Sequence, residues 1–404
     1  MTTHSRRRFL GLGLGAGATL AAGLPGLSFA AAGAGEARLV VVILRGAVDG
    51  LAAAPPYGDP DYAAARGAIA IAPPAAAHGA LDLDGFFGLH PALPLLHERY
   101  RAGELVVVHA TASPYRERSH FDGQNVLENG GAQPSGAASG WLNRALAALP
   151  GGAGQGLALG QNVPLSLRGP VPVGSWAPSA LPEVESELVT RLRDLHSADP
   201  TLSARLDEAT RIGALASAEG AGGAAAPQPA ARGANVERLK AVAGTAGRML
   251  AAEGGPRVAV MDAGGWDTHA GEGGAEGQLA GRLHVLDLVL AALRDGLGVH
   301  WASSAVLVCT EFGRTVEING TRGTDHGTGA AAFVVGGAVH GGRVLADWPG
   351  LAAQQRLDGR DLRPTTDLRS IAKGLLADHL RLPPRALESV FPGSTAPARD
   401  LIRA

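Results

Sequence analysis

Five short apolar runs recur along the chain and constrain its fold more than any other feature. Runs of this length, rich in valine, leucine and isoleucine, are typical of strands buried on both faces of a parallel sheet. Segments with helical spacing separate them, and strand–helix alternation is the pattern of α/β proteins. The sequence therefore predicts an α/β fold with a mainly parallel central sheet flanked by helices. The runs are residues 38–44, 105–109, 257–261, 305–310 and 330–335.

The composition limits the class of protein. A chain of 404 residues can hold one large α/β domain or two smaller ones, and a hydrophobic content of 46% excludes a mostly disordered chain. The net charge of −2 gives no reason to expect nucleic acid as a partner. The single cysteine, Cys309, lies inside an expected core strand, so an internal disulfide is impossible and a small buried side chain is favoured over a reactive thiol.

The N-terminus predicts export. Residues 1–32 combine a basic start, a weakly apolar glycine- and alanine-rich run and small residues at a cleavage site, as a signal peptide does. Arg6 and Arg7, followed by Phe9 and Leu10, match the twin-arginine signal, which implies the twin-arginine translocase as a partner during export. A retained membrane anchor is the alternative, and we favour cleavage. We therefore expect a periplasmic or secreted protein with no stable membrane span after processing.

One stretch differs from the rest of the mature chain. Residues 214–233 are almost all alanine, glycine and proline, which predicts a flexible insertion. Helix and strand patterns continue on both sides of it, so it does not convincingly separate two domains. We expect residues 37–404 to form a single domain.

Polar clusters follow the expected strands. An open α/β sheet forms its ligand crevice at the carboxyl ends of its strands. Side chains from several of the loops that follow the strands are therefore expected to meet there. Gathered carboxylates repel one another and need a cation, and carboxylate and imidazole groups are donors for a divalent metal or groups for acid/base work. The expected metal ligands are Asp49, Asp267, His269, Glu311, Asp325 and His326.

The loop after the second run is the most polar in the first half of the chain. Ser119 is open to three roles, as a nucleophile, a metal-facing hydroxyl or the N-cap of a helix that begins near Phe121. The first and third are compatible, because free N–H groups at a helix start bind anions. We name four candidate catalytic residues: Ser119, His120, Arg118 and Arg314.

At these residues the chain resembles the DUF1501 proteins, which belong to the alkaline phosphatase-like superfamily and commonly carry twin-arginine signals. The resemblance covers nearly all of the mature chain. The matching motifs are Leu-Arg-Gly-Ala-Val-Asp-Gly-Leu (44–51), Arg-Ser-His-Phe-Asp (118–122), Gly-Trp-Asp-Thr-His (265–269), Thr-Glu-Phe-Gly-Arg (310–314) and Gly-Thr-Asp-His-Gly (323–327).

The resemblance implies an alkaline phosphatase-like fold that holds one or two metals. It places Asp49 at the first ligand, Ser119 at or near the nucleophile, and Asp267 with His269 at the third cluster. By the same likeness, the last two ligand positions fall on Glu311 and His326.

Two positions depart from the superfamily pattern. The superfamily usually has Asp-His where this chain has Glu311-Phe312, so one imidazole ligand is missing, and Asp325 or His120 is the candidate to replace it. Around Pro114 and Arg116 the spacing fits the sulfatase signature, but Ala112 occupies the place of the modifiable Cys or Ser. A formylglycine sulfatase mechanism is therefore not expected.

The function that these features favour is hydrolysis of phosphate or sulfate esters, with Zn, Mg, Mn or Ca as the divalent cation. The cation would polarise the ester oxygen and stabilise an alkoxide on Ser119, and Arg118 or Arg314 would neutralise the anion. The expected substrate is an anionic small-molecule or polysaccharide ester. The alternative is a non-catalytic periplasmic or envelope binding protein, which the Glu311-Phe312 departure favours. A periplasmic oxidoreductase has only the signal in its support, because no Rossmann or haem fingerprint is present.

Overall fold

A computed structural model describes residues 37–152, 154–178, 186–218 and 232–403. Residues 1–32, where we predict the twin-arginine signal, lie outside the described residues. Ala37–Ala404 form one compact unit. The predicted insertion is described only at its two ends, where residues 214–218 continue one helix and residues 232–233 begin the next; residues 219–231 are not described.

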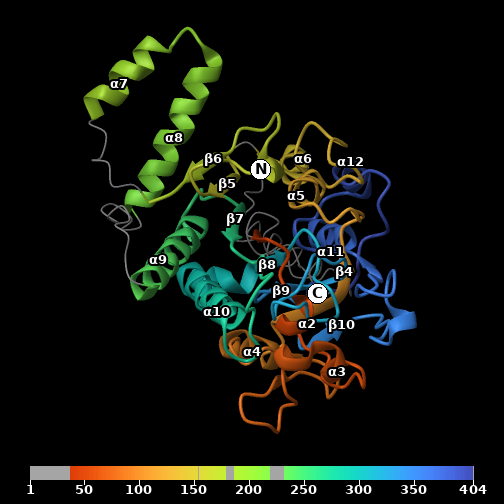
Figure 1. The fold of residues 1–404 in the computed structure, drawn as a ribbon. Coiled ribbons are helices and arrows are strands. Elements are labelled where there is room, and N and C mark those ends of the chain that lie inside the picture. The colour runs from red at the N-terminus through yellow and green to blue at the C-terminus, as the bar shows by residue number, and fades with distance from the viewer. Residues whose placement is uncertain (1–36, 153, 179–185, 219–231, 404) are drawn as a thin grey trace, which may run out of the picture. The chain divides into compact units, whose positions relative to one another are not determined.

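A nine-stranded sheet forms the centre of the molecule (Figure 1). Its strands are ordered β10-β4-β9-β8-β1-β7-β5-β6, and β11 pairs with β4 beyond one end of β10. All five runs predicted from the sequence are strands of this sheet. The strands are β1 Arg38–Arg45, β4 Leu105–Ala112, β5 Gly156–Leu159, β6 Gly174–Trp176, β7 Val258–Gly264, β8 Ser304–Cys309, β9 Ala330–Val335, β10 Arg343–Leu345 and β11 Thr366–Asp367.

One strand runs against the others. β9 pairs antiparallel with both β4 and β8, whereas every other pairing in this sheet is parallel. The start of β9 therefore lies at the same edge of the sheet as the carboxyl ends of its neighbours. A separate two-stranded hairpin consists of β2 (Leu81–Asp82) and β3 (Gly88–Leu89).

Helices cover both faces of the sheet, and each face has its own apolar core. Alternate side chains of a strand point to opposite faces, so in β1 Val40 and Val42 belong to one core while Val41 and Ile43 belong to the other. The first core packs under α4 (Pro94–Arg101), α9 (Arg232–Ala251) and α10 (Gln278–Leu297). The second packs under α6 (Trp141–Ala148), α11 (Leu368–Gly374) and α12 (Pro384–Val390), which lie on the other side of the sheet in Figure 1.

The structure describes five further α-helices. They are α2 Gly50–Ala53, α3 Tyr62–Arg66, α5 His120–Asn129, α7 Ser186–Leu195 and α8 Pro200–Ala218. Among the described residues, no helix has both the length and the apolar character needed to span a membrane. The structure confirms the predicted α/β class with a mostly parallel central sheet flanked by helices.

Candidate metal centre

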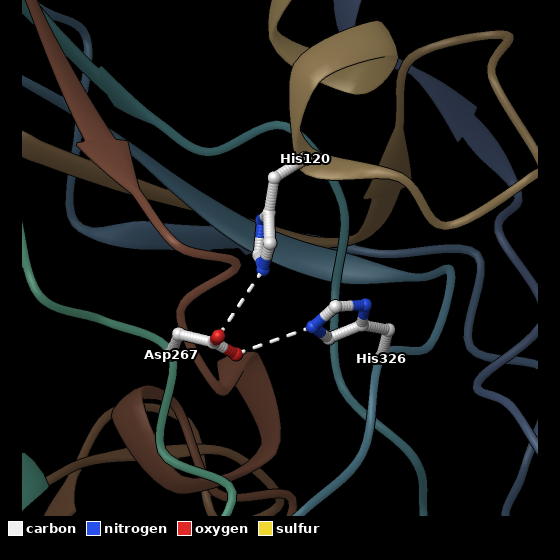
Figure 2. Close-up of side chains that lie close together, drawn as sticks. All are labelled: His120, Asp267 and His326. Atoms are coloured by element: carbon white, nitrogen blue, oxygen red, sulfur yellow. Dashed lines mark hydrogen bonds and ion pairs between the residues drawn. The ribbon is translucent and has the colours of Figure 1, made fainter.

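Three side chains from three separate segments of the chain meet at one edge of the sheet (Figure 2). His120 is the first residue of α5, Asp267 follows β7, and His326 precedes β9. One metal-binding atom of each lies within 4.8 Å of the other two. In Figure 2 dashed lines join the carboxylate of Asp267 to both imidazoles. Its Oδ2 lies 3.4 Å from Nε2 of His120, and its Oδ1 lies 3.2 Å from Nε2 of His326.

A third imidazole adds a fourth donor atom. Nε2 of His269 lies 3.1 Å from Oδ1 of Asp267 and 3.0 Å from Nε2 of His326. Tetrahedral donors held about 2.0–2.1 Å from a zinc ion are roughly 3.4 Å from one another. The separations of His269 and His326 from Asp267 and from each other are close to that value. The group whose donor atoms all lie within 4.8 Å of one another is His120, Asp267 and His326, so these three are the candidate ligands and His269 lies beside them.

Each of the three imidazoles uses its other nitrogen as a hydrogen-bond donor to an oxygen. Nδ1 of His120 donates to Glu311 Oε1 (2.8 Å), and Nδ1 of His326 donates to the carbonyl oxygen of Arg118 (2.9 Å). Nδ1 of His269 faces Asp325 Oδ1 at 3.2 Å. These acceptors carry no proton to give, so they fix the proton on Nδ1 and leave the Nε2 lone pair exposed. Such partners are typical of metal-binding histidines.

This arrangement leaves lone pairs facing each other. Nε2 of His120 is buried and makes no well-oriented hydrogen bond among the described residues, although Asp267 Oδ2 lies 3.4 Å away. The Nε2 atoms of His269 and His326 face each other at 3.0 Å. Two acceptor nitrogens at this distance repel unless a proton or a cation lies between them. Imidazole and carboxylate donors suit a transition-metal ion, so the residues present fit a divalent cation.

Neighbouring groups shift the pKa values of the residues in the cluster. The hydrogen bond to Glu311 raises the pKa of His120, while burial lowers the pKa of His326. Burial alone would raise the pKa of Asp267, but the charge of Arg314 and the three imidazoles lower it. Asp267 is therefore ionised, as a metal ligand must be, and protons compete with a cation for His120.

Arg314 forms an ion pair with Asp267. Its guanidinium is fully buried, and its Nη1 is 2.9 Å from Asp267 Oδ1. No guanidinium nitrogen of Arg314 has a well-oriented hydrogen bond among the described residues, so the contact with Asp267 is one of charge and proximity. By contrast, the side chains of Asp267 and His269 are 40% and 45% exposed, which leaves the outer side of the donor cluster open to a ligand.

Asp49 belongs to a different, buried cluster. Its Oδ1 accepts from the backbone N–H groups of Leu51 and Ala52, as the N-cap of α2, and its Oδ2 pairs with the guanidinium of Arg66. It is not a member of the His120–Asp267–His326 group. Burial would raise the pKa of Asp49, but Arg66 lowers it. The predicted role of Asp49 as a metal ligand therefore remains a prediction, and its charge is already compensated.

Glu272 completes this second cluster, and neither it nor Arg66 was identified from the sequence. Oε2 of Glu272 accepts from the hydroxyls of Thr268 and Thr324, while Oε1 lies 3.6 Å from Arg66. Burial, and next the negative charge of Asp49, raise the pKa of Glu272 to about 8. Both residues lie outside the motifs that follow the predicted strands, so no local sequence pattern marks them.

The other predicted residues surround the donor cluster. Glu311 and Asp325 contact the Nδ1 side of His120 and His269. The guanidinium of Arg118 is paired with Asp361 (2.7 Å) and Asp358 (3.3 Å). The roles predicted for these residues stay predictions.

Ser119 is the N-cap of α5 by position, but its side chain makes no capping hydrogen bond. Its backbone N–H donates to the Tyr115 hydroxyl at 3.1 Å. Ser119 is half-buried and directly precedes His120. The hydroxyl therefore does not cap the helix, and its role as a nucleophile stays a prediction.

Comparison with known families gives one match. Residues 105–391, more than half of the chain, match the family described as "Protein of unknown function (DUF1501)". The match includes every donor of the cluster and leaves out the first motif, around Asp49. No curated protein is significantly similar to the chain.

The solved structures that resemble this chain include two distant likenesses. A phosphonate monoester hydrolase of Agrobacterium radiobacter is 13% identical, with 90% of this chain and 79% of that chain covered and a TM-score of 0.39. The protein Ps i-CgsB, solved in complex with k-i-k-neocarrahexaose, is 8% identical, with 76% and 68% covered and a TM-score of 0.35. Likeness at this level carries no inference about activity.

Proposed function

The chain belongs to the DUF1501 family, and we propose that it is an exported, metal-dependent hydrolase of phosphate or sulfate esters. One observation carries the proposal. The Nε2 atoms of three histidines surround a single carboxylate, and each ring has its Nδ1 held by an oxygen acceptor. Nε2 lone pairs that are held next to a carboxylate by acceptors at Nδ1 are suited to binding a cation.

The proposed ligands are His120, Asp267 and His326, with His269 as the fourth donor. Three imidazoles and one carboxylate favour a zinc-like transition metal over Mg or Ca, which prefer oxygen donors. A divalent cation bound there supplies Lewis-acid polarisation of an ester oxygen. Arg314 lowers the pKa of Asp267 and thereby keeps the carboxylate ionised for its role as a ligand.

Ser119 is the proposed nucleophile. Its hydroxyl is free of the capping bond that most serines at this position make, and it directly precedes the ligand His120. If it attacks the ester, Ser119→Ala should abolish turnover while metal content and stability stay nearly unchanged. A loss of stability of about 1 kcal/mol with activity intact would instead give the hydroxyl a structural role.

The test of the metal proposal is elemental analysis of the purified protein, combined with a panel of chromogenic phosphate, sulfate and phosphonate esters. His326→Ala and Asp267→Asn should lose both the metal and the turnover. His340→Ala is the matched control, because His340 is also a partly exposed histidine paired with an aspartate, Asp400, but is not in the cluster. Retention of metal and activity in His326→Ala and Asp267→Asn would contradict the proposal.

A second candidate is a non-catalytic binding protein that retains the metal. The two arginines expected to neutralise an anionic ester favour it, because Arg118 is already paired with two aspartates and Arg314 is fully buried. This function predicts stoichiometric metal with no turnover of any ester in the panel. It also predicts that binding of an anionic oligosaccharide is unaffected by Ser119→Ala.

Export by the twin-arginine route is part of the proposal and rests on Arg6 and Arg7. Replacing both with lysine should leave unprocessed precursor in the cytoplasm. Cleaved protein appearing in the periplasm at the normal level would point to the general secretory route.

A further inference from the structure

We propose that Glu311 and Phe312 form a clamp that fixes His120 as a metal ligand, and that Glu311 is a positioning residue and not itself a ligand. The inference rests on the proposed metal centre. It concerns the dipeptide at which this chain departs from the superfamily pattern.

The hydrogen bonds of Glu311 place it behind the ligand. Its side chain is fully buried. Oε1 accepts from the backbone N–H of Gly46 (2.8 Å), from Nδ1 of His120 (2.8 Å) and from Nε2 of Gln124 (3.1 Å), and Oε2 accepts from the Thr310 hydroxyl (2.9 Å). A carboxylate with this many donors has little free capacity for a cation.

The edge of the His120 ring that Glu311 contacts also indicates a positioning residue and not a ligand. Glu311 contacts Nδ1 of His120, whereas Asp267 lies 3.4 Å from Nε2, the other ring nitrogen. Because an imidazole has its two nitrogens on different edges, a cation that shares Nε2 with Asp267 is kept away from Glu311 by the ring itself.

Glu311 also binds two residues of one helical turn. His120 and Gln124 are four residues apart on α5, so they lie on the same face of the helix, and both donate to the same oxygen. The carboxylate therefore orients the imidazole and at the same time holds the start of α5 against the end of β8.

Phe312 fixes the face of the same ring. Its centroid is 5.0 Å from that of His120 with the planes 25° apart, and it also lies 5.3 Å from His326. Gly123 of α5 makes room for this contact, because a Cβ there would be 3.0 Å from the Phe312 ring. With its edge bonded to Glu311 and its face stacked on Phe312, the imidazole keeps one orientation.

Without the acceptor that Glu311 provides at Nδ1, the proton of neutral His120 is more stable on Nε2, the nitrogen that would bind the cation. If the acceptor at Nδ1 is removed, a proton on Nε2 can be donated to Oδ2 of Asp267, which is 3.4 Å away. That proton would occupy the lone pair that binds the cation. Glu311 thus selects the tautomer that is competent for metal binding.

The experiment compares Glu311→Ala and Glu311→Gln with the wild type by competition titration with Zn²⁺ and by the absorption spectrum of the Co²⁺ form. We expect Glu311→Ala to lose about 10–100-fold in Zn²⁺ affinity, the range usual for partners that orient a ligand. Glu311→Gln keeps an acceptor oxygen and should lose less. Both should retain one ion in the same donor set, so the Co²⁺ bands should keep their positions.

The matched control is Glu128→Gln. Glu128 is also a buried glutamate with a backbone donor, Ser166, and an ion pair with Arg45, but it does not contact His120. Its substitution should leave Zn²⁺ affinity within about twofold of the wild type. An equal loss in Glu128→Gln would show a general effect of disturbing a buried carboxylate and would overturn the inference. Shifted Co²⁺ bands with an oxygen donor lost in Glu311→Gln would make Glu311 a ligand, with the same consequence.

A readout in the metal-free protein separates this inference from the proposed function. At a pH where the ring is neutral, ¹⁵N NMR of wild-type His120 should show the proton on Nδ1, and in Glu311→Ala it should show the proton on Nε2. A wild-type Nε2–H tautomer would overturn the clamp even if the protein binds metal. A wild type that binds no metal but has the Nδ1–H tautomer would instead overturn the proposed function and leave the positioning by Glu311 intact.

Discussion

At the scale of single residues, the partner of a carboxylate decides its role more than its place in a motif does. Asp49 follows β1 as the sequence analysis expected, yet Arg66 and two backbone N–H groups already satisfy it. His120 was named as a catalytic candidate and proves to lie in the donor cluster. Neither contact is readable from the sequence, because Asp49 and Arg66, like His120 and Glu311, belong to separate elements whose contact is set by the tertiary fold.

Substitution of Asp49 tests this distinction. Asp49→Asn leaves the buried guanidinium of Arg66 without its main counter-charge, so we expect the free energy of unfolding to fall by about 3–5 kcal/mol. Metal content should not change, because Asp49 is outside the donor cluster. Chemical denaturation and elemental analysis measure the two effects. Loss of metal with stability intact would instead make Asp49 a ligand, as the sequence predicts.

The raised pKa of Glu272 predicts how stability depends on pH. The folded protein keeps a proton on Glu272 up to about pH 8, whereas the unfolded chain releases it near the ordinary value of 4.5. Between these values the folded state binds more protons, so this group's contribution is complete below pH 4.5 and is lost as pH rises to 8. Glu272→Gln should remove this slope in unfolding curves taken across the range. The same change at the exposed Glu276 should leave the slope as in the wild type.

At the scale of elements, continuous apolar runs are sufficient to predict five of the nine strands of the sheet, but not the direction of each strand. The run at residues 330–335 resembles the others, and its antiparallel pairing follows from the connection and not from its composition. The short strands β5 and β6 were not resolved as separate strands in the sequence, because glycine and proline interrupt the apolar pattern there. The helices α7 and α8 are separated by residues 196–199, and α8 begins at Pro200.

The segment between β8 and β9 provides a prediction at this scale. Its two ends approach closely at Gly313, whose N–H donates to Thr328 at 3.0 Å, and a Cβ there would lie 1.8 Å from the carbonyl oxygen of Gly329. Gly313→Ala must push the two ends apart, and we expect it to lower both thermal stability and Zn²⁺ affinity. Gly320 is in the same segment with nothing within 4 Å of its Cβ position, so Gly320→Ala should be nearly neutral in both measurements.

At the scale of the whole molecule, the donor cluster exists only when the sheet is complete. Its three members, His120, Asp267 and His326, come from the start of α5, the loop after β7 and the segment before β9. An ion that binds these donors binds the folded state alone and should stabilise it by about 2.7 kcal/mol at a concentration one hundred times its dissociation constant. Thermal melts of metal-free protein should therefore shift upward with added Zn²⁺, and His326→Ala should not respond. An equal shift in that variant would place the binding elsewhere.

The reversal of β9 has an evolutionary consequence. The segment from β8 to β9 leaves and re-enters the sheet in adjacent strands, with Glu311 near one anchor and His326 near the other. A stretch held in this way can be lengthened, shortened or exchanged between related chains while its two ends stay in place. We therefore expect members of the family that differ in substrate to differ in the tip of this segment, and to differ little in the donors at its base.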